Sequence, residues 1–258
     1  MSFLYEVMTE EFGKRYISEV ELPTIIKNNL NKRFEIRPYQ KEVFQRFILF
    51  FNNSFENKQN PPFHLLFNMV IGSGKTLIMA GLIIYLYEKG YRNFIFTASS
   101  TNIIEKTKDN FLNSYSSKFL FSDYITCDNK NIKIKEVDSF ETADRDNINI
   151  CFTTIHQLHI DLNCEKENSL SFEDFKQYDI CLLADEAHHF NTSTRNGQGE
   201  LFESWENTII KILEQNYKNI LLEFTATIDY EHKNIIEKYK PKVIYRYDLK
   251  QFRSDGYS

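Results

Sequence analysis

A short glycine-rich segment carries the most chemically specific pattern in the 258-residue sequence. Gly72-Ser73-Gly74-Lys75-Thr76 follows an apolar run, Phe63 to Val70, and opens a helix-like stretch. Glycines let a backbone turn around an oxyanion with its N–H groups pointing inward, and a helix N-terminus adds positive potential. Lys75 can reach the β- and γ-phosphates of a nucleotide, and the Thr76 hydroxyl can ligate Mg²⁺. The segment therefore predicts a site for a Mg²⁺-bound nucleoside triphosphate.

The pattern departs from the usual G-x-x-x-x-G-K-[ST] spacing at one position, because Met69 stands where the first glycine is expected. The alternative interpretation is a glycine-rich turn between strand and helix that carries a solvated lysine. The strand, the Gly-x-Gly-Lys-Thr segment and the helix occur together as phosphate binding requires, and this favours the phosphate site.

Two adjacent carboxylates form the second chemical feature. Asp185 and Glu186 follow the apolar run Tyr178 to Ala184, and so stand at the carboxyl end of an expected strand. Ligands bind at this edge in open α/β sheets. Asp185 could hold the metal ion, and Glu186 could orient or deprotonate the attacking water. Taken alone, such a pair also fits a helix cap or a solvated loop, but the phosphate pattern upstream favours the catalytic interpretation.

The histidines and cysteines do not suggest a metal site. His188 and His189 follow the acidic pair, and adjacent side chains point in different directions on a regular element, so we expect a structural or coupling role. The cysteines form no C-x-x-C pair, which argues against a zinc site and a disulfide framework. They are Cys127, Cys151, Cys164 and Cys181. We expect Cys151 and Cys181, inside apolar runs, to be buried.

The elements that position these groups alternate between strand and helix patterns from Phe63 onward, which predicts an α/β fold with a mostly parallel sheet and helices on both faces. The expected strands after Phe63–Val70 are Asn93–Thr97, Asn149–Thr153, Asp179–Ala184, Asn219–Phe224 and Lys242–Tyr247. The expected helices are Thr24–Leu30, Tyr39–Phe51, Lys75–Lys89, Thr101–Ser114, Glu200–Gln215 and Glu231–Tyr239. Helix Lys75–Lys89 is apolar on nearly every side, which predicts a central, buried position. The polar segment Leu112–Asn147 yields no assignment.

Composition limits the range of partners. The net charge is −5, so no bulk positive field holds a polyanion, and any nucleic-acid contact must be local. The longest nearly apolar run, Leu77 to Tyr87, is shorter than the roughly 20 residues of a membrane span. Met1 to Gly13 lacks the apolar core of a signal peptide. We expect a cytoplasmic protein with no membrane contact.

Four segments, in this order, resemble motifs of the superfamily-2 helicases and translocases. Arg37-Pro38-Tyr39-Gln40 is similar to the upstream glutamine motif, and Met69 to Thr76 resembles motif I, in which the first glycine is commonly replaced. Asp185-Glu186-Ala187-His188 resembles a DEAH-type motif II, and Phe224-Thr225-Ala226-Thr227 resembles motif III. Four motifs in sequence are far more specific than any one of them.

Within that superfamily, the chain resembles the helicase-bearing restriction (Res) subunit of type III restriction enzymes from about Glu21 onward. The segments that carry the narrower resemblance are Thr101–Thr107, the doubled histidine, Leu222–Ile228 and Tyr247–Phe252. The resemblance implies a RecA-like P-loop NTPase domain over residues 37–258, preceded by a helical extension over residues 1–36. It also implies that a second RecA-like domain and a nuclease are absent from this chain, which we interpret as the first motor domain of a longer protein.

The resemblance also implies roles for individual residues. Gln40 would read the adenine edge, with Arg37 supporting that pocket, although an ordinary exposed glutamine is the alternative. Residues that would contact nucleic-acid phosphates, or alternatively cap helices, are Thr97, Ser99, Ser100, Thr153 and Thr154. Residues that would couple the nucleotide state to the nucleic acid are His188, Thr225 and Thr227.

The implied activity is that of a DNA-dependent ATPase and translocase within a type III site-specific deoxyribonuclease. ATP and Mg²⁺ would be its cofactors, and DNA, a second RecA-like domain in cis and a DNA methyltransferase subunit its partners. The second domain of such motors supplies arginines, so the isolated chain is expected to hydrolyse ATP slowly. Two alternatives stay open: an RNA helicase of the same superfamily, and a nucleotide-binding interaction module without motor activity. A P-loop kinase is disfavoured because no arginine-rich lid is visible.

Overall fold

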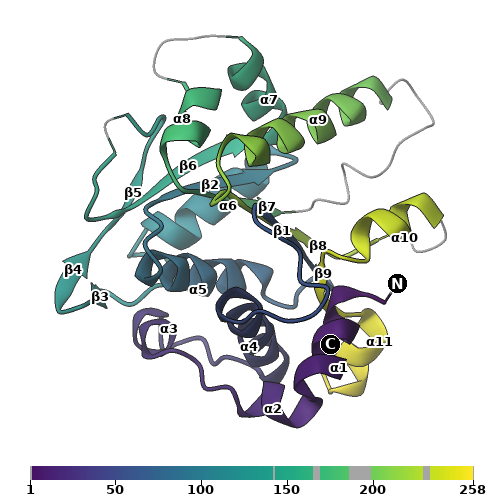
Figure 1. Cartoon of the computed structure of the whole chain (residues 1–258). Helices are drawn as coiled ribbons and strands as arrows, with labels where there is room; N and C mark the ends of the chain where they lie inside the picture. Colours follow the sequence, from purple (N-terminus) through teal and green to yellow (C-terminus); the bar gives the residue numbers. More distant parts are fainter. Residues whose placement is uncertain (1, 142, 165–168, 186–198, 229–232, 258) are drawn as a thin grey trace.

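The computed structural model describes residues 2–141, 143–164, 169–185, 199–228 and 233–257. A parallel sheet runs through the molecule, with strand order β5-β6-β2-β7-β8-β1-β9 (Figure 1). Its strands are β1 (Phe63–Met69), β2 (Asn93–Ala98), β5 (Ile134–Glu136), β6 (Ile148–Thr154), β7 (Ile180–Asp185), β8 (Ile220–Thr225) and β9 (Val243–Tyr247). A separate antiparallel hairpin consists of β3 (Ile125–Cys127) and β4 (Lys130–Ile132). The predicted α/β class with a parallel sheet is confirmed.

Helices cover both faces of this sheet (Figure 1). They are α1 (Leu4–Phe12), α2 (Lys14–Glu19), α3 (Thr24–Asn29), α4 (Pro38–Asn52), α5 (Lys75–Glu88), α6 (Thr101–Leu112), α7 (Ile155–Asn163), α8 (Phe172–Gln177), α9 (Gly199–Gln215), α10 (Lys233–Tyr239) and α11 (Leu249–Ser254). One face packs against α3, α4, α5 and α6, and the opposite face packs against α7, α8 and α9. Because side chains alternate along each strand, strands buried on both faces read as the continuous apolar runs of the sequence.

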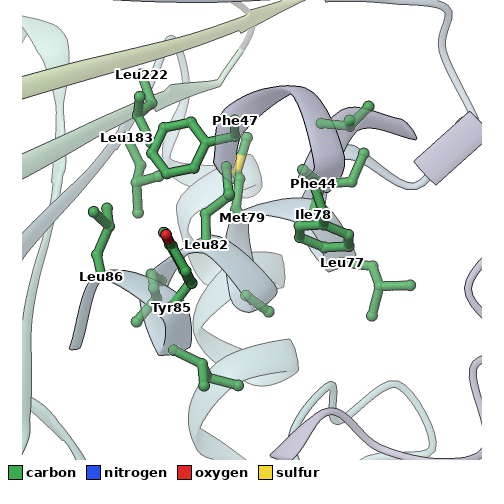
Figure 2. Close-up of a cluster of buried hydrophobic side chains, with 14 of the residues drawn as sticks. Phe44, Phe47, Leu77, Ile78, Met79, Leu82, Tyr85, Leu86, Leu183 and Leu222 are labelled. Carbon is green, nitrogen blue, oxygen red and sulfur yellow. The ribbon is translucent and has the colours of Figure 1, made fainter. Parts of the chain in front are cut away.

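Helix α5 lies at the centre of the larger core, as its sequence predicts. Figure 2 shows Phe47 of α4 beside Met79 and Leu82 of α5, with Leu183 and Leu222 of the sheet next to them. All residues of α5 from Leu77 to Tyr87 are buried. This burial fixes the helix that begins at the glycine-rich segment.

Helices α4 and α5 approach each other unusually closely at Gly81. A Cβ atom added there would lie 2.6 Å from the ring of Phe44, so only glycine fits without a shift of that ring. The close packing brings the N-terminal ends of α4 and α5 to the same region of the molecule. Tyr39 and Gln40 in the first turn of α4 thereby contact the segment that precedes α5.

Several elements were not predicted. Helices α7, α8 and α11 are short or weakly patterned, and the segment left unassigned supplies β3, β4 and β5. Helices α1 and α2 were expected only as part of a helical extension over residues 1–36, without individual bounds. Strand β5 pairs with β6 at the edge of the main sheet. The predicted division at residue 36 remains a prediction, since Leu4, Met8 and Ile17 of the N-terminal helices belong to the same apolar cluster as the sheet.

The four cysteines are free thiols, and Cys151 and Cys181 are buried in the core as predicted. Burial raises the pKa of both thiols, that of Cys151 to about 12, so they remain protonated in the apolar interior. Within the part of the chain that the structure describes, no helix has the length and apolar character needed to cross a membrane.

Candidate nucleotide-binding site

The carboxyl ends of all seven strands meet at one edge of the parallel sheet, and the predicted phosphate and acidic segments both lie there. Strand β1 leads into Gly72–Thr76, called the phosphate loop below, and β7 ends at Asp185. The two strands are not direct neighbours in the sheet. Strand β8 lies between them, which separates the axes of β1 and β7 by about 10 Å. The space above the end of β8 is therefore flanked by both segments.

Two glycines give the phosphate loop its shape. Gly72 and Gly74 have φ angles of +81° and +80°, in the left-handed region that side chains with a Cβ disfavour. Gly74 is the N-cap of α5, so Lys75 and Thr76 are the first residues of that helix. The loop thus curls at a helix N-terminus, where partial positive charge and N–H groups converge.

Two side chains at the loop are buried although they are polar. Lys75 is 8 % exposed and is held at the base of the loop at the start of α5. The Ser73 hydroxyl is fully buried, and no partner for it exists among the residues that the structure describes. A buried polar atom without a partner is costly, and a ligand or a bound ion at the loop would relieve that cost. This observation fits the presence of a phosphate-bearing ligand.

The side chains of Tyr39 and Gln40 hold the phosphate loop from outside. The Tyr39 hydroxyl donates a 3.0 Å hydrogen bond to the Ser73 carbonyl, and Gln40 Nε2 donates a 2.8 Å bond to the same oxygen. Gln40 Oε1 also accepts from the backbone N–H of Arg37, at 3.0 Å. The buried Gln40 side chain therefore links the N-terminus of α4 to the loop.

These contacts bear on the predicted adenine pocket. Each end of the Gln40 amide already makes one hydrogen bond, which leaves one N–H and one acceptor lone pair for a base. The Arg37 side chain is exposed, and its guanidinium lies over the ring of Tyr257 at 4.7 Å. Base recognition by Gln40 and Arg37 stays a prediction, whereas the alternative of an exposed glutamine is wrong.

Asp185 lies at the end of β7 and is 8 % exposed. Alternation along β7 puts its side chain on the same face as Cys181 and Leu183, which belong to the cluster around α5. The carboxylate is thus directed to the side of the sheet where the phosphate loop opens. Glu186 and His188 lie outside the residues that the structure describes.

The threonines after β8 form a local turn beside the phosphate loop. The buried Thr225 hydroxyl donates a 2.9 Å hydrogen bond to the Thr227 carbonyl and accepts a 3.3 Å bond from the Thr227 N–H. Asn68 of β1 is the register partner of Thr225 and donates from Nδ2 to the Thr225 carbonyl at 3.3 Å. The turn is therefore connected to the strand that carries the loop.

The predicted nucleic-acid contacts divide into buried and accessible residues. Thr97 is fully buried within β2, and its hydroxyl, like that of Ser73, has no partner among the residues that the structure describes, so its contact with a phosphate stays a prediction. Thr154 caps α7 by accepting from the Gln157 N–H at 3.2 Å. Ser99 is exposed, and Ser100 and Thr153 are half-buried. These three residues lie at the same sheet edge as the phosphate loop.

Sequence reasoning missed Tyr39 at this site, and it missed a pair farther from the loop, the partly buried His64 near the amino end of β1 and the buried Glu223 within β8. His64 Nε2 and Glu223 Oε2 are 2.7 Å apart and join β1 to β8 below the two turns. No spacing in the sequence pairs residues 159 positions apart. The sequence did contain a signal for Tyr39, because this residue directly precedes Gln40, which we selected as a candidate site residue.

Comparison with known proteins places this arrangement in a family. Residues 33–230 match the family model described as "Type III restriction enzyme, res subunit". The chain is 36 % identical over 262 aligned residues to the probable type III restriction-modification enzyme HindVIP Res subunit of Haemophilus influenzae, covering 92 % of this chain. It spans 50 % of that relative's length.

Two solved structures share the fold. One is the DUF1998 helicase MrfA bound to DNA and AMPPNP, with a TM-score of 0.54 and 16 % identity over 88 % of this chain and 29 % of that one. The other is a nuclease-deletion mutant of the Type ISP restriction-modification enzyme LlaGI with a DNA substrate mimic, with a TM-score of 0.51 and 15 % identity over 86 % and 20 % of the two chains. These likenesses confirm the predicted RecA-like fold. The chain belongs to the family of type III restriction enzyme Res subunits.

Proposed function

We propose that this chain is the ATP-binding motor domain of a DNA-dependent ATPase and translocase of a type III restriction enzyme. The observation that carries the proposal is the convergence of the phosphate loop and Asp185 on the same edge and the same face of the sheet, on either side of the end of β8. P-loop motors bind nucleotide between such a loop and such a carboxylate.

The residues of the loop have separate tasks in this proposal. The backbone N–H groups between Gly72 and Thr76 bind the phosphates, and the Lys75 ammonium neutralises the charge that develops during phosphoryl transfer. The Thr76 hydroxyl and Asp185 hold Mg²⁺, and the fit of such a ligand is supported by the orphaned Ser73 hydroxyl at the loop. When bound, the metal ion supplies Lewis-acid polarisation of the phosphoryl oxygens. Glu186 orients or deprotonates the attacking water.

We base the proposed nucleic-acid polymer and protein partners on the match to the type III restriction enzyme Res subunits. The matched relative is named as part of a restriction-modification enzyme, which favours DNA over RNA as the polymer. Ser99, Ser100 and Thr153 are the accessible candidates for phosphate contacts on the nucleic acid. Thr225, Thr227 and His188 are the candidates for coupling. A second RecA-like domain in cis and a methyltransferase subunit complete the proposed assembly, in the cytoplasm.

The central test removes the Lys75 ammonium. Lys75→Ala is expected to lower ATP hydrolysis by about 10²–10³-fold, the effect of losing one preorganised charge at developing negative charge. Lys89→Ala, at the far end of the same helix, is the matched control, since that lysine is exposed and lies over the Tyr85 ring. Titration calorimetry with MgATP and a phosphate-release assay measure binding and turnover separately.

Four outcomes would contradict the proposal or part of it. A wild-type chain that binds no ATP, or Lys75→Ala turnover equal to that of Lys89→Ala, would remove the ATPase assignment. Rapid DNA-stimulated turnover by this chain alone would contradict the expectation that an arginine from a second domain is required. Stimulation of the full-length protein by RNA and not by duplex DNA would replace the translocase with an RNA helicase.

A further inference from the structure

The carbonyl oxygen of Ser73 is held by two side chains from a segment more than thirty residues upstream. Tyr39 Oη and Gln40 Nε2 both donate to it, at 3.0 and 2.8 Å. A carbonyl oxygen has two lone pairs, so these two donors saturate it. Both donors are buried in the first turn of α4, whose position is fixed by packing against α5.

Fixing this carbonyl also fixes the direction of the Gly74 N–H group. The Ser73 carbonyl and the Gly74 N–H belong to one planar trans peptide unit, in which the C=O and N–H bonds point in opposite directions. With the oxygen directed to α4, the Gly74 N–H is directed away from α4. Gly74 has φ near +80° and could otherwise rotate its flanking peptides easily, because glycine lacks a Cβ.

The Tyr39 ring is itself immobilised by aromatic neighbours. It stacks on Tyr247 of β9, with ring centroids 4.3 Å apart and planes inclined by 17°. Phe252 and Tyr257 contact it edge-on, at 6.2 and 5.2 Å. Such packing leaves one orientation for the hydroxyl-bearing end of the ring.

The Tyr39 hydroxyl is also polarised by Arg37. Arg37 Nη1 donates to the hydroxyl oxygen at 3.1 Å, while the hydroxyl donates onward to Ser73. A donor that simultaneously accepts from a cation makes a stronger hydrogen bond. Burial raises the pKa of Tyr39, and the hydroxyl therefore keeps its proton at neutral pH.

We infer that Tyr39 is a positioning residue for phosphate binding: its hydroxyl holds the Ser73–Gly74 peptide in the orientation that presents the Gly74 N–H to the nucleotide. This role rests on the proposed function, because it needs a nucleotide at the phosphate loop. It differs from base recognition, since the Tyr39 hydroxyl acts on the loop and not on the base. It also connects Arg37, β9 and α11 to the loop through one side chain.

The test replaces Tyr39 by phenylalanine and measures the affinity for MgADP by titration calorimetry. Tyr39→Phe removes the hydroxyl and keeps the ring, so MgADP affinity is expected to fall about 3- to 10-fold, as for the loss of one hydrogen bond. The ratio of MgADP to MgGDP affinity is expected to stay unchanged. The matched control is Tyr91→Phe, which removes a buried hydroxyl that donates to the Lys218 carbonyl at 2.7 Å, at the amino edge of the sheet.

A second variant addresses the shared carbonyl. Gln40→Met removes the other donor, and the double variant Tyr39→Phe/Gln40→Met leaves the Ser73 oxygen without either one. If both side chains orient the same peptide, the double variant loses more affinity than the sum of the single losses, because after either single substitution the remaining donor still restrains the oxygen in part. Additive losses would mean that the two donors act on different parts of the site.

The outcomes separate this inference from the proposed function. If the wild-type chain does not bind MgADP or MgATP, the proposed function fails. If the wild type binds and Tyr39→Phe binds equally well, only the role of Tyr39 is overturned. Equal loss of affinity in Tyr39→Phe and Tyr91→Phe would assign the effect to general stability. If Tyr39→Phe fails to fold, a wild-type MgADP affinity in Gln40→Met would show that restraint of the Ser73–Gly74 peptide from α4 does not affect nucleotide binding, and would overturn the inference.

Discussion

Two turns follow neighbouring strands at the same sheet edge, and they keep their shapes in different ways. The phosphate loop after β1 depends on Tyr39 and Gln40, which reach it from another helix. The turn after β8 satisfies itself, because Thr225 both donates to and accepts from Thr227 two residues away. The shape of the phosphate loop therefore depends on contacts with a distant segment, and the shape of the turn after β8 depends mainly on hydrogen bonds within the turn. Substitutions in α4 can therefore alter the phosphate loop, whereas the hydroxyl hydrogen bonds of the turn after β8 are altered by substituting Thr225 itself.

The largest effect is expected at Gly74. A left-handed residue other than glycine costs about 1–2 kcal/mol, and a Cβ at this position would also collide with Gln40 Nε2. Gly72 has nearly the same φ angle, but an added Cβ there meets nothing within 4 Å. Gly74→Ala should therefore lower the free energy of unfolding more than Gly72→Ala, as measured by urea denaturation without nucleotide.

Comparing Gly74→Ala with Gly72→Ala in a Gln40→Ala background identifies why their free energies of unfolding differ. Without the glutamine amide, the two glycine substitutions should cost equal free energy, since only the backbone strain remains. Equal costs in the wild-type background would show that the loop is not held from α4. That result would mean that the phosphate loop, like the turn after β8, keeps its shape without contacts from α4.

A smaller effect is expected at Thr225. Thr225→Val removes both hydrogen bonds of the hydroxyl and should lower the free energy of unfolding by about 1 kcal/mol. Thr225→Ser keeps the hydroxyl and serves as the control. Because the phosphate loop is held from α4, MgADP affinity should change less than in Tyr39→Phe. A larger loss of affinity in Thr225→Val would show that the two turns form one unit.

At neutral pH the smallest effect is expected at the pair of His64 and Glu223, which joins β1 to β8 and whose contribution changes with pH. Burial lowers the pKa of His64 below its ordinary value of 6.5, although Glu223 opposes the shift. Burial acts to raise the pKa of Glu223, but His64, Lys242 and Lys238 outweigh it and lower that pKa below 4.5. Because both pKa values are lower in the folded protein, His64 and Glu223 are each protonated at a higher pH in the unfolded chain. Stability is therefore lost below pH 6.5 through His64 and below pH 4.5 through Glu223.

The measurement is the free energy of unfolding between pH 7 and pH 5. It should decrease with falling pH, with a contribution from His64 of at most about 1.4 kcal/mol per pH unit. His64→Gln should flatten the slope, and His156→Gln, which changes an exposed histidine on α7, should leave it unchanged. An unaltered slope in His64→Gln would mean that the contact between His64 and Glu223 does not contribute to the pH dependence.

Much of the sheet could be predicted from sequence because its strands are buried on both faces. A continuous apolar run between turn residues identifies such a strand without any knowledge of its neighbours, and the ends of β2, β6, β7 and β8 fell within one residue of expectation. Short helices such as α8 and α11 lack a full amphipathic period. The three-residue strands of the segment before β6 carry too little pattern to be recognised.

The glycine and lysine spacing alone determined that a turn with left-handed glycines opens a helix, because left-handed backbone and a helix N-terminus are local requirements. Only the tertiary structure decided that β8 separates this turn from Asp185, that Thr97 is buried, and that Tyr39 and Gln40 converge on the Ser73 carbonyl. Strand order and contacts between distant segments depend on how the helices pack against the sheet. No spacing within one segment encodes them.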